Sequence, residues 1–300
     1  MLSDALLDAL MCPVCGGKPL GLVVEEANDD VIVTGTLACP DCKRWFNVRS
    51  DIPRMMPPDL ASNLVGSDAV WEGWTEAMHR FLRWRDAAWR DAEAAATRRE
   101  TALAMHRRFV DFCALPDGPL TLLDVGCGTG HAIDLLPDDV TYIGIDPLPA
   151  GASPWGSIPQ RMPRPERPPN LVQGVGELLP FADDSFDAVL VMGTLDHCRD
   201  PREMLEHVAR VLRPGGTLGV LQGVSARRDD GAGGMLQSLW RSLMGQQSPS
   251  ARDTHLHSYA SADDVTALLA GWFDVQDSVE DSGRAFVRAT VSAAEPGGEG

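Results

Sequence analysis

The chain has 300 residues, of which 44% are hydrophobic and 23% are charged, as in an ordinary soluble globular protein. Its formal net charge of −17 opposes binding to phosphate backbones, so a nucleic-acid partner is disfavoured. No stretch approaches the roughly 18 apolar residues that a membrane helix needs, and aspartates stand where a secretory signal would carry basic residues. We expect a cytoplasmic protein without membrane contact, built from two units because of its length.

Four cysteines form two close pairs near the N-terminus, Cys12 with Cys15 and Cys39 with Cys42. Each C-x2-C pair can present two thiolates, and four thiolates complete the tetrahedral site that Zn²⁺ prefers. Because protein would fill all four positions, this zinc ion is expected to be structural. Short β-like runs lie between the pairs, and prolines follow them. The sequence therefore predicts a small β-rich zinc module over residues 1–58.

The same region resembles a known family. The segments CPVCGGKPL and RWFNVRSDIPRMMP, with the second cysteine pair between them, resemble the Trm112-like zinc-binding domain. The resemblance covers residues 11 to about 58. In that family the domain is a partner or stabiliser of methyltransferases, which implies a protein-partner or dimer contact through the zinc module.

Residues 59–116 are predicted to form a linker and a helical arm, because apolar residues from Val70 to Leu115 recur at spacings of three and four. Trp74 in this stretch is a candidate wall of a substrate pocket. Gly73-Trp74 resembles the sequence before the arm of fused zinc-module methyltransferases. Packing of the arm on the core is the alternative role for this tryptophan.

From residue 117 to 292, strand-like runs alternate with helical ones, which predicts a parallel Rossmann-like α/β sheet with helices on both faces. The expected strands are residues 120–125, 140–145, 171–173, 186–192 and 217–222. Prolines between 147 and 170 exclude a regular crossover helix there and predict a long loop or lid. Residues 293–300 are expected to be a disordered tail.

The first expected strand of this domain ends in a glycine-rich turn, the segment LLDVGCGTG. Glycines let the backbone approach a ligand closely, and the following helical turn offers free amides, so a nucleotide-like ligand is indicated. A nicotinamide-dinucleotide fingerprint would need glycine where His131 stands. Asp146 ends the second strand and is placed to accept both hydroxyls of a ribose.

These motifs, with ELLPF, DSFD and RVLRPGG farther along, resemble the class I methyltransferase family of the Methyltransf_11 type over residues 120 to 222. The resemblance implies S-adenosylmethionine as cofactor. Val175 stands where the family usually has an aspartate for the adenine amino group. The cofactor-binding residues that the resemblance implies are Asp124, Gly126, Cys127, Gly128, Gly130, Asp146, Pro147, Gly176, Glu177, Leu178 and Met192.

Three histidines are candidates for the acceptor side. His197 follows the fourth strand at the edge where open α/β sheets bind ligands, and it is a candidate catalytic base. A packing role beside the cofactor is its alternative. His255 and His257 alternate along the chain and are candidate substrate-binding residues; surface or capping roles remain open for both.

Three functions are compatible with these patterns. The first is methyl transfer from S-adenosylmethionine to oxygen or nitrogen of a small molecule, such as a natural product or a sugar. The second is methylation of rRNA or tRNA bases, which the acidic charge disfavours. The third is a non-catalytic scaffold or activator partner that uses the zinc module for docking.

Overall fold

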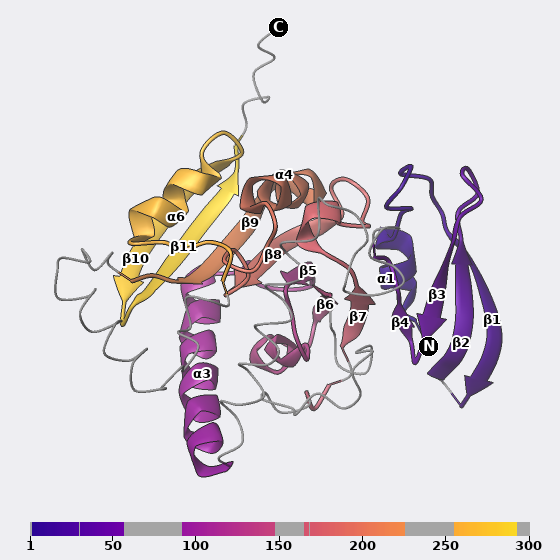
Figure 1. Ribbon diagram of the computed structural model, residues 1–300, viewed down its shortest axis with the longest axis horizontal. Helices are drawn as coiled ribbons and strands as arrows, with labels where there is room; N and C mark the ends of the chain where they lie inside the picture. The colour runs from indigo at the N-terminus through magenta and orange to yellow at the C-terminus, as the bar shows by residue number, and fades with distance from the viewer. Residues whose placement is uncertain are drawn as a thin grey trace, which may run out of the picture.

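The computed structural model describes residues 2–29, 31–56, 92–147, 165–167, 169–225 and 255–292, and these fold around two β-sheets (Figure 1). The smaller sheet is antiparallel and lies at the N-terminus. Its strands, in spatial order, are β1 (Gly21–Asn28), β2 (Val31–Ala38), β3 (Trp45–Arg49) and β4 (Ile52–Pro53). The predicted β-rich N-terminal module is confirmed.

The larger sheet has seven strands in the order β10-β11-β9-β8-β5-β6-β7. Its five strands from β5 to β9 are parallel, while β11 runs antiparallel to both β9 and β10. The strands are β5 (Leu120–Val125), β6 (Val140–Asp146), β7 (Asn170–Gln173), β8 (Phe186–Met192), β9 (Leu212–Gly223), β10 (Phe273–Asp281) and β11 (Arg284–Val291). The predicted Rossmann-like sheet is confirmed, and an antiparallel hairpin extends it at one side.

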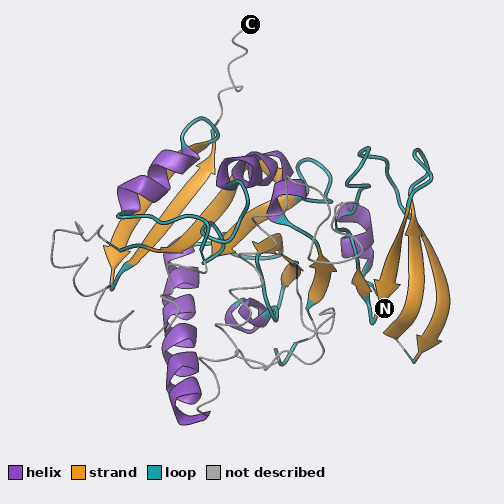
Figure 2. Cartoon of the chain, in the orientation of Figure 1, coloured by secondary structure: helices purple, strands orange, loops and turns teal. Residues whose placement is uncertain are grey.

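Helices cover both faces of this sheet, as predicted (Figure 2). On one face, α3 (Ala92–Cys113) and the short 3₁₀ helix η1 (His131–Leu135) share an apolar cluster with β5, β6 and β9. On the other, α4 (Pro201–Val211) and α6 (Ala262–Leu269) bury the apolar sides of their helices. Asp200 caps α4 by accepting hydrogen bonds from two backbone amides of its first turn, and Pro201 occupies the first helical position.

The N-terminal module packs directly against the β7 side of the large sheet. Arg54, which follows β4, forms a parallel bridge with Gln173 of β7. A second set of backbone contacts follows α1 (Asp4–Ala9), where Leu10 bridges Phe181 and the amide of Met11 donates to Pro180 at 2.9 Å. Apolar residues of the module belong to the same buried cluster as those of β5 and β6. The two units therefore share one hydrophobic core.

Several sequence expectations fall outside the described residues. These are the linker and the first part of the arm, including Trp74, most of the proline-rich stretch from 147 to 170, and the tail 293–300. The domain boundaries stay predictions. Among the residues that the structure describes, no helix combines the length and the apolar character needed to cross a membrane.

The shared core predicts that the module and the domain of the larger sheet unfold together. Leu10 is 1% exposed at their junction, so Leu10→Ala should lower the free energy of unfolding by about 2–5 kcal/mol. Urea unfolding followed by fluorescence and circular dichroism measures this. Val23→Ala is the control, because Val23 is 57% exposed on β1 and its truncation should cost under about 0.5 kcal/mol. Equal stabilities of the two variants would contradict a shared core.

Candidate functional site

The four cysteines of the module come together in one cluster. Sγ of Cys12 lies 3.7 Å from Sγ of Cys42, and Sγ of Cys15 lies 3.5 Å from Sγ of Cys39. All four sulfurs lie within 4.8 Å of one another. Zinc–sulfur bonds of about 2.3 Å in a tetrahedron require sulfur–sulfur separations of about 3.8 Å. The cluster therefore fits a structural zinc ion, in agreement with the cysteine spacing.

Close packing at Gly17 and backbone hydrogen bonds shape the surroundings of these thiols. A Cβ on Gly17 would lie 2.8 Å from Sγ of Cys39 and 2.5 Å from a carboxylate oxygen of Asp41, so only glycine fits beside the cluster. Burial raises the pKa of Cys12 to about 12. Burial also acts to raise that of Cys39, but hydrogen bonds from the amides of Cys42 and Asp41 outweigh it and hold the pKa of Cys39 at about 7. A cation at the centre would favour the deprotonated form of all four.

A second site lies where the carboxyl ends of β5 and β6 meet. The amide of Gly126 donates to the carbonyl of Ile145 at 2.8 Å, which carries the loop after β5 across the end of β6. The amide of Gly128 then donates to Oδ2 of Asp146 at 2.9 Å. Thr194, which follows β8, closes the other side through a 3.0 Å hydrogen bond to the carbonyl of Val125. The glycine turn and the predicted ribose carboxylate thus form one unit.

The three glycines of this turn serve different purposes, although all have positive φ. A Cβ on Gly126 would lie 2.1 Å from Oγ1 of Thr194, and one on Gly130 would lie 2.9 Å from Pro169. These two glycines permit close packing within the protein. A Cβ on Gly128 meets no atom within 4 Å among the described residues. Open space beside a backbone turn is what a bound ligand requires.

Asp124 supplies a further sign of a ligand site. The residue is fully buried, and its Oδ2 accepts a 2.7 Å hydrogen bond from the hydroxyl of Tyr142. Its Oδ1 has no hydrogen-bond partner among the described residues. Burial, with a smaller contribution from the Asp146 charge, raises the pKa of Asp124 to about 7. A buried acceptor of this kind fits the cationic methionine part of S-adenosylmethionine, whose binding would restore the negative form.

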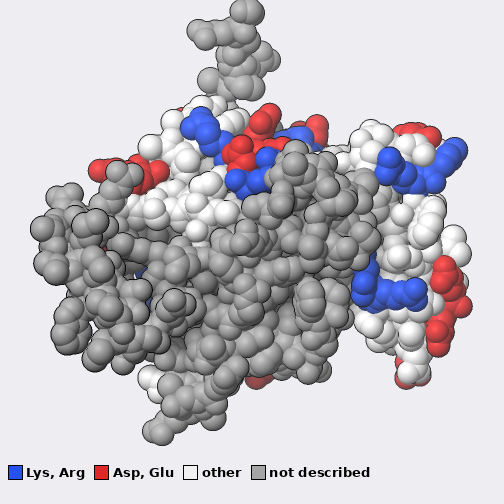
Figure 3. All heavy atoms as spheres, in the orientation of Figure 1, with Lys and Arg blue, Asp and Glu red and all other residues white. Residues whose placement is uncertain are grey.

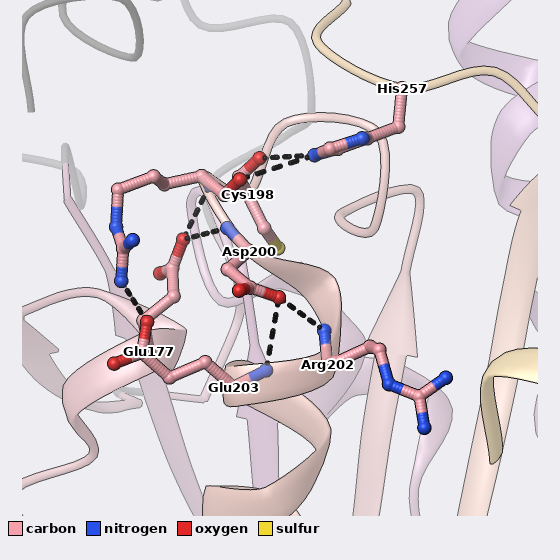
Figure 4. Close-up of polar contacts among 7 residues, drawn as sticks. Glu177, Cys198, Asp200, Arg202, Glu203 and His257 are labelled. Carbon is pink, nitrogen blue, oxygen red and sulfur yellow. Dashed lines mark hydrogen bonds and ion pairs between the residues drawn. The ribbon is translucent and has the colours of Figure 1, made fainter. Parts of the chain in front are cut away.

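The Gly176–Leu178 segment, predicted to flank adenine, forms the 3₁₀ helix η2 (Gly176–Leu178) after β7. The Glu177 side chain is 3% exposed, and its Oε1 accepts hydrogen bonds from the amides of Arg199 and Asp200 (Figure 4). Burial raises the pKa of Glu177. Its carboxylate therefore ties η2 to the start of α4, and the backbone of η2 rather than this side chain can face a ligand.

The remaining predicted cofactor residues lie around the same strand ends. Cys127 is buried, and its amide donates to the carbonyl of Ile145 at 3.2 Å. The carbonyl of Pro147 accepts a 3.0 Å hydrogen bond from the Gln173 side chain, and Met192 ends β8, half-buried. The structure thus brings the predicted set together at one edge of the sheet. Val175 occupies the position before η2, makes no side-chain capping hydrogen bond and is 3% exposed.

Of the histidines predicted to lie on the acceptor side, His197 and His255 lie against each other although they are 58 positions apart. Their rings are stacked, with centroids 4.5 Å apart and an interplanar angle of 24°. Asp196 joins them: its Oδ2 lies 2.6 Å from Nδ1 of His255, and its Oδ1 lies 3.9 Å from Nε2 of His197. The sequence analysis did not predict a role for Asp196. The only indication in the sequence is that Asp196 directly precedes His197 in the loop after β8.

Burial and charge act together on this cluster. Burial acts to raise the pKa of Asp196, but the hydrogen bond and charge of His255, with the charge of His197, outweigh it and lower the pKa. Burial lowers the pKa of His197, and Asp196 opposes this shift only in part. The His197 ring is therefore neutral near pH 7 and keeps a nitrogen lone pair. Such a ring can accept a proton or bind a metal ion.

His257 makes a different contact from His255. Its Nε2 lies 3.1 Å from the carbonyl of Cys198 and 3.3 Å from that of Arg199 (Figure 4). Because both partners are carbonyls, Nε2 carries the proton and donates. His257 thus braces the loop that carries Asp196 and His197. Its predicted role in substrate binding stays a prediction.

Comparison with known proteins follows the same division of the chain. Residues 3–51 match the family described as Trm112p-like protein, and residues 123–220 match the family described as methyltransferase domain. The chain joins a Trm112p-like domain to a methyltransferase domain. This methyltransferase family implies S-adenosylmethionine as cofactor, and the four-cysteine cluster suggests structural zinc.

Curated relatives named as methyltransferases match part of the chain. An uncharacterized methyltransferase of Mycolicibacterium vanbaalenii is 38% identical over 98 residues, which are 32% of this chain and 36% of the relative. A rice protein named "Probable tocopherol O-methyltransferase, chloroplastic" is 30% identical over 172 residues, which are 53% of this chain and 46% of the relative. A tRNA U34 carboxymethyltransferase of Shewanella frigidimarina is 41% identical over 101 residues, which are 33% of this chain and 30% of the relative. The chain spans less than half the length of each.

Removing one cysteine should empty the zinc site. Cys39→Ser leaves three thiolates, and structural zinc is worth roughly 10–16 kcal/mol in small zinc domains, so the module should unfold and expose the shared core. Metal analysis should find one zinc ion fewer per Cys39→Ser chain than per wild-type chain, because only the cysteine cluster has lost a ligand. Cys113→Ala, which removes a buried cysteine outside the cluster, should retain zinc. Loss of zinc from both variants, or from neither, would contradict this assignment.

The first turn after the glycine loop carries a pH-sensitive contact. Nε2 of His131 lies 2.8 Å from Nδ1 of His106, and burial lowers the pKa of each ring to about 4. Between the unfolded pKa of about 6.5 and the folded pKa of about 4, only the unfolded chain binds the proton. Stability should therefore fall as the pH drops through this window, by about 2 kcal/mol for His131 between pH 7.5 and 5.

Urea unfolding at both pH values measures this loss. His131→Gln should lose about 2 kcal/mol less than the wild type between pH 7.5 and 5, because the titrating ring is gone. Asp139→Asn, at an exposed position before β6, should lose as much as the wild type. A pH dependence that His131→Gln leaves unchanged would show that the ring is already charged in the folded protein.

Proposed function

We propose that this chain transfers a methyl group from S-adenosylmethionine to an oxygen or nitrogen atom of a small-molecule acceptor. The contact between the Gly128 amide and the Asp146 carboxylate carries this proposal, since it joins the glycine turn of β5 to the carboxyl end of β6. A ribose diol beside Asp146 and a methionine group beside Gly128 would occupy adjoining positions. Oδ1 of Asp124, which has no hydrogen-bond partner in the part of the chain that the structure describes, supports a positively charged ligand in the same place.

When bound, S-adenosylmethionine supplies a methyl group on a positively charged sulfur, which an acceptor lone pair can attack. The protein's part is to hold both groups in line, to exclude water and to take up the acceptor proton. His197 lies at the carboxyl edge after β8, next to Asp196 and His255. We assign activation of the acceptor to this cluster. When no metal ion is bound there, the neutral ring of His197 is the group that takes up the acceptor proton.

The surface charge favours a small acceptor over RNA. On the face drawn in Figure 3, Lys and Arg of the described residues are interspersed with Asp and Glu. With a net charge of −17, a protein of this kind has little to gain from counterion release on a phosphate backbone. The named activity of the rice relative, an O-methyltransferase, agrees with an oxygen acceptor.

Methylation of tRNA is the second candidate, because the Shewanella relative is named for chemistry at a tRNA base. It predicts tRNA binding that weakens steeply as salt rises. A filter-binding titration with bulk tRNA at 50 and 200 mM salt separates the two functions. Binding lost by roughly a thousandfold between these conditions would favour tRNA, while absence of binding at both favours a small acceptor.

The zinc module would act as a built-in stabiliser of the methyltransferase domain, which agrees with the Trm112p-like match. Its backbone contacts to Gln173 and Pro180 flank η2, the segment predicted to face adenine. A scaffold without activity is the remaining alternative, and buried Val175, in place of the usual aspartate, is the observation that favours it.

Calorimetry with S-adenosylmethionine tests the proposal on the zinc-loaded chain. The wild type should bind at micromolar concentration, and Asp146→Ala should bind about 10- to 150-fold more weakly, since a charge-assisted hydrogen bond is worth about 1.5–3 kcal/mol. Asp139→Ala, exposed near the start of the same strand, should bind like the wild type. No heat at millimolar cofactor would favour the scaffold and reject the enzyme.

A further inference from the structure

The cluster at the acceptor side has the composition of an open metal site. Asp196, His197 and His255 each offer one ligand atom, and these atoms all lie within 4.8 Å of one another. Two imidazoles and one carboxylate are ligands that divalent transition metals such as Zn²⁺, Co²⁺ and Fe²⁺ accept readily. The two histidines come from separate segments, so the fold rather than the local sequence creates this set.

The two segments are fixed to each other by backbone contacts. The amide of Leu256 donates to the carbonyl of Asp196 at 2.8 Å, so the residue after His255 is held against the residue before His197. The hydroxyl of Tyr259 donates to the carbonyl of Leu195 at 3.3 Å. Tyr259 in turn forms a parallel bridge with Val224, directly after β9. The donor atoms are therefore held in position before an ion binds, which lowers the entropic cost of binding.

Burial of the cluster is partial, as a site open to an acceptor requires. The side chains of Asp196, His197 and His255 are 15%, 18% and 26% exposed. The facing atoms are Nδ1 of His255, Nε2 of His197 and the two carboxylate oxygens between them. Metal–nitrogen and metal–oxygen bonds of about 2.0–2.2 Å need ligand atoms about 3 Å apart or slightly more, so small movements would admit an ion.

We propose that Asp196, His197 and His255 bind a divalent transition-metal ion that keeps at least one coordination position for the methyl acceptor. This ion is distinct from the zinc of the cysteine cluster, where protein fills all four positions. Three protein ligands with an open fourth position are typical of catalytic rather than structural metal sites.

The consequence for catalysis rests on the proposed function. An acceptor hydroxyl bound to the ion would lose its proton to solvent at a lower pH than in water, as metal-bound water does. The rings of His197 and His255 would then act as ligands, and the ion would activate the acceptor in place of a free base. Metal binding itself does not depend on methyl transfer and can be measured alone.

The experiment titrates the zinc-loaded full chain with Co²⁺, followed by calorimetry and visible absorption. The wild type should bind one Co²⁺ with the weak d–d bands of nitrogen and oxygen ligands and without intense thiolate bands. Substitutions in the shell around metal ligands cost about 10- to 100-fold in affinity, so loss of a ligand in Asp196→Asn or His255→Gln should cost at least about 100-fold. His207→Gln on α4, outside the cluster, should bind like the wild type.

A measurement without substitutions accompanies the titration. Proton NMR of the Co²⁺-loaded wild type should show exchangeable imidazole signals from two histidines, shifted far outside the ordinary range by the paramagnetic ion. Absence of saturable Co²⁺ binding, absence of these signals, or equal binding by the Asp196 and His255 variants would each overturn the proposal. Cofactor calorimetry on the same samples separates the outcomes: failed Co²⁺ binding with retained S-adenosylmethionine binding rejects the metal site alone.

Discussion

Parallel pairing of β5 with β6 and β8 is the constraint on which the candidate site depends. In a parallel sheet all carboxyl ends meet at one edge, so the loops that leave these strands must lie together. The hydrogen bond from Gly128 to Asp146 and that from Thr194 to Val125 are direct results of this arrangement. A single shift in the register of β6 against β5 would move Asp146 away from the glycine turn and disrupt the predicted ribose site.

The edge of the same sheet explains the position of the zinc module. An outer strand such as β7 presents unpaired amides and carbonyls, which proteins cover by a loop or another chain segment. Here the amide of Met55 donates to the carbonyl of Gln173 in β7 at 2.7 Å, and the amide of Met11 donates to that of Pro180, beyond η2. The module is small and shares its core with the larger sheet, and a zinc ion would fix its cysteine loops so that these backbone groups are held in place. Module and domain therefore stabilise each other.

Sequence patterns predicted the parts of the fold that local chemistry decides. The strands from β5 to β8 lie where buried apolar runs indicated them, and the cysteine pairs predicted their own cluster. The pairing of β10 with β11 was missed, because nearly all residues of β10 are exposed at the sheet edge and carry no buried apolar face. The bridge of Arg54 with Gln173 was missed as well, since a pairing between distant segments leaves no local pattern.

The acceptor side shows why the rest required a structure. Glu177 resembles a ligand residue in the sequence, yet its carboxylate is used by the amides of Arg199 and Asp200. Asp196 has no motif of its own, yet it lies between two histidines that the fold brings from separate segments. The role of a carboxylate depends on the hydrogen-bond donors that surround it after folding. Those neighbours cannot be identified from the sequence alone. The acceptor activation that we propose therefore depends on loop contacts after β8 and β9, which no single segment encodes, whereas the glycine turn of the cofactor motif is visible in one continuous segment.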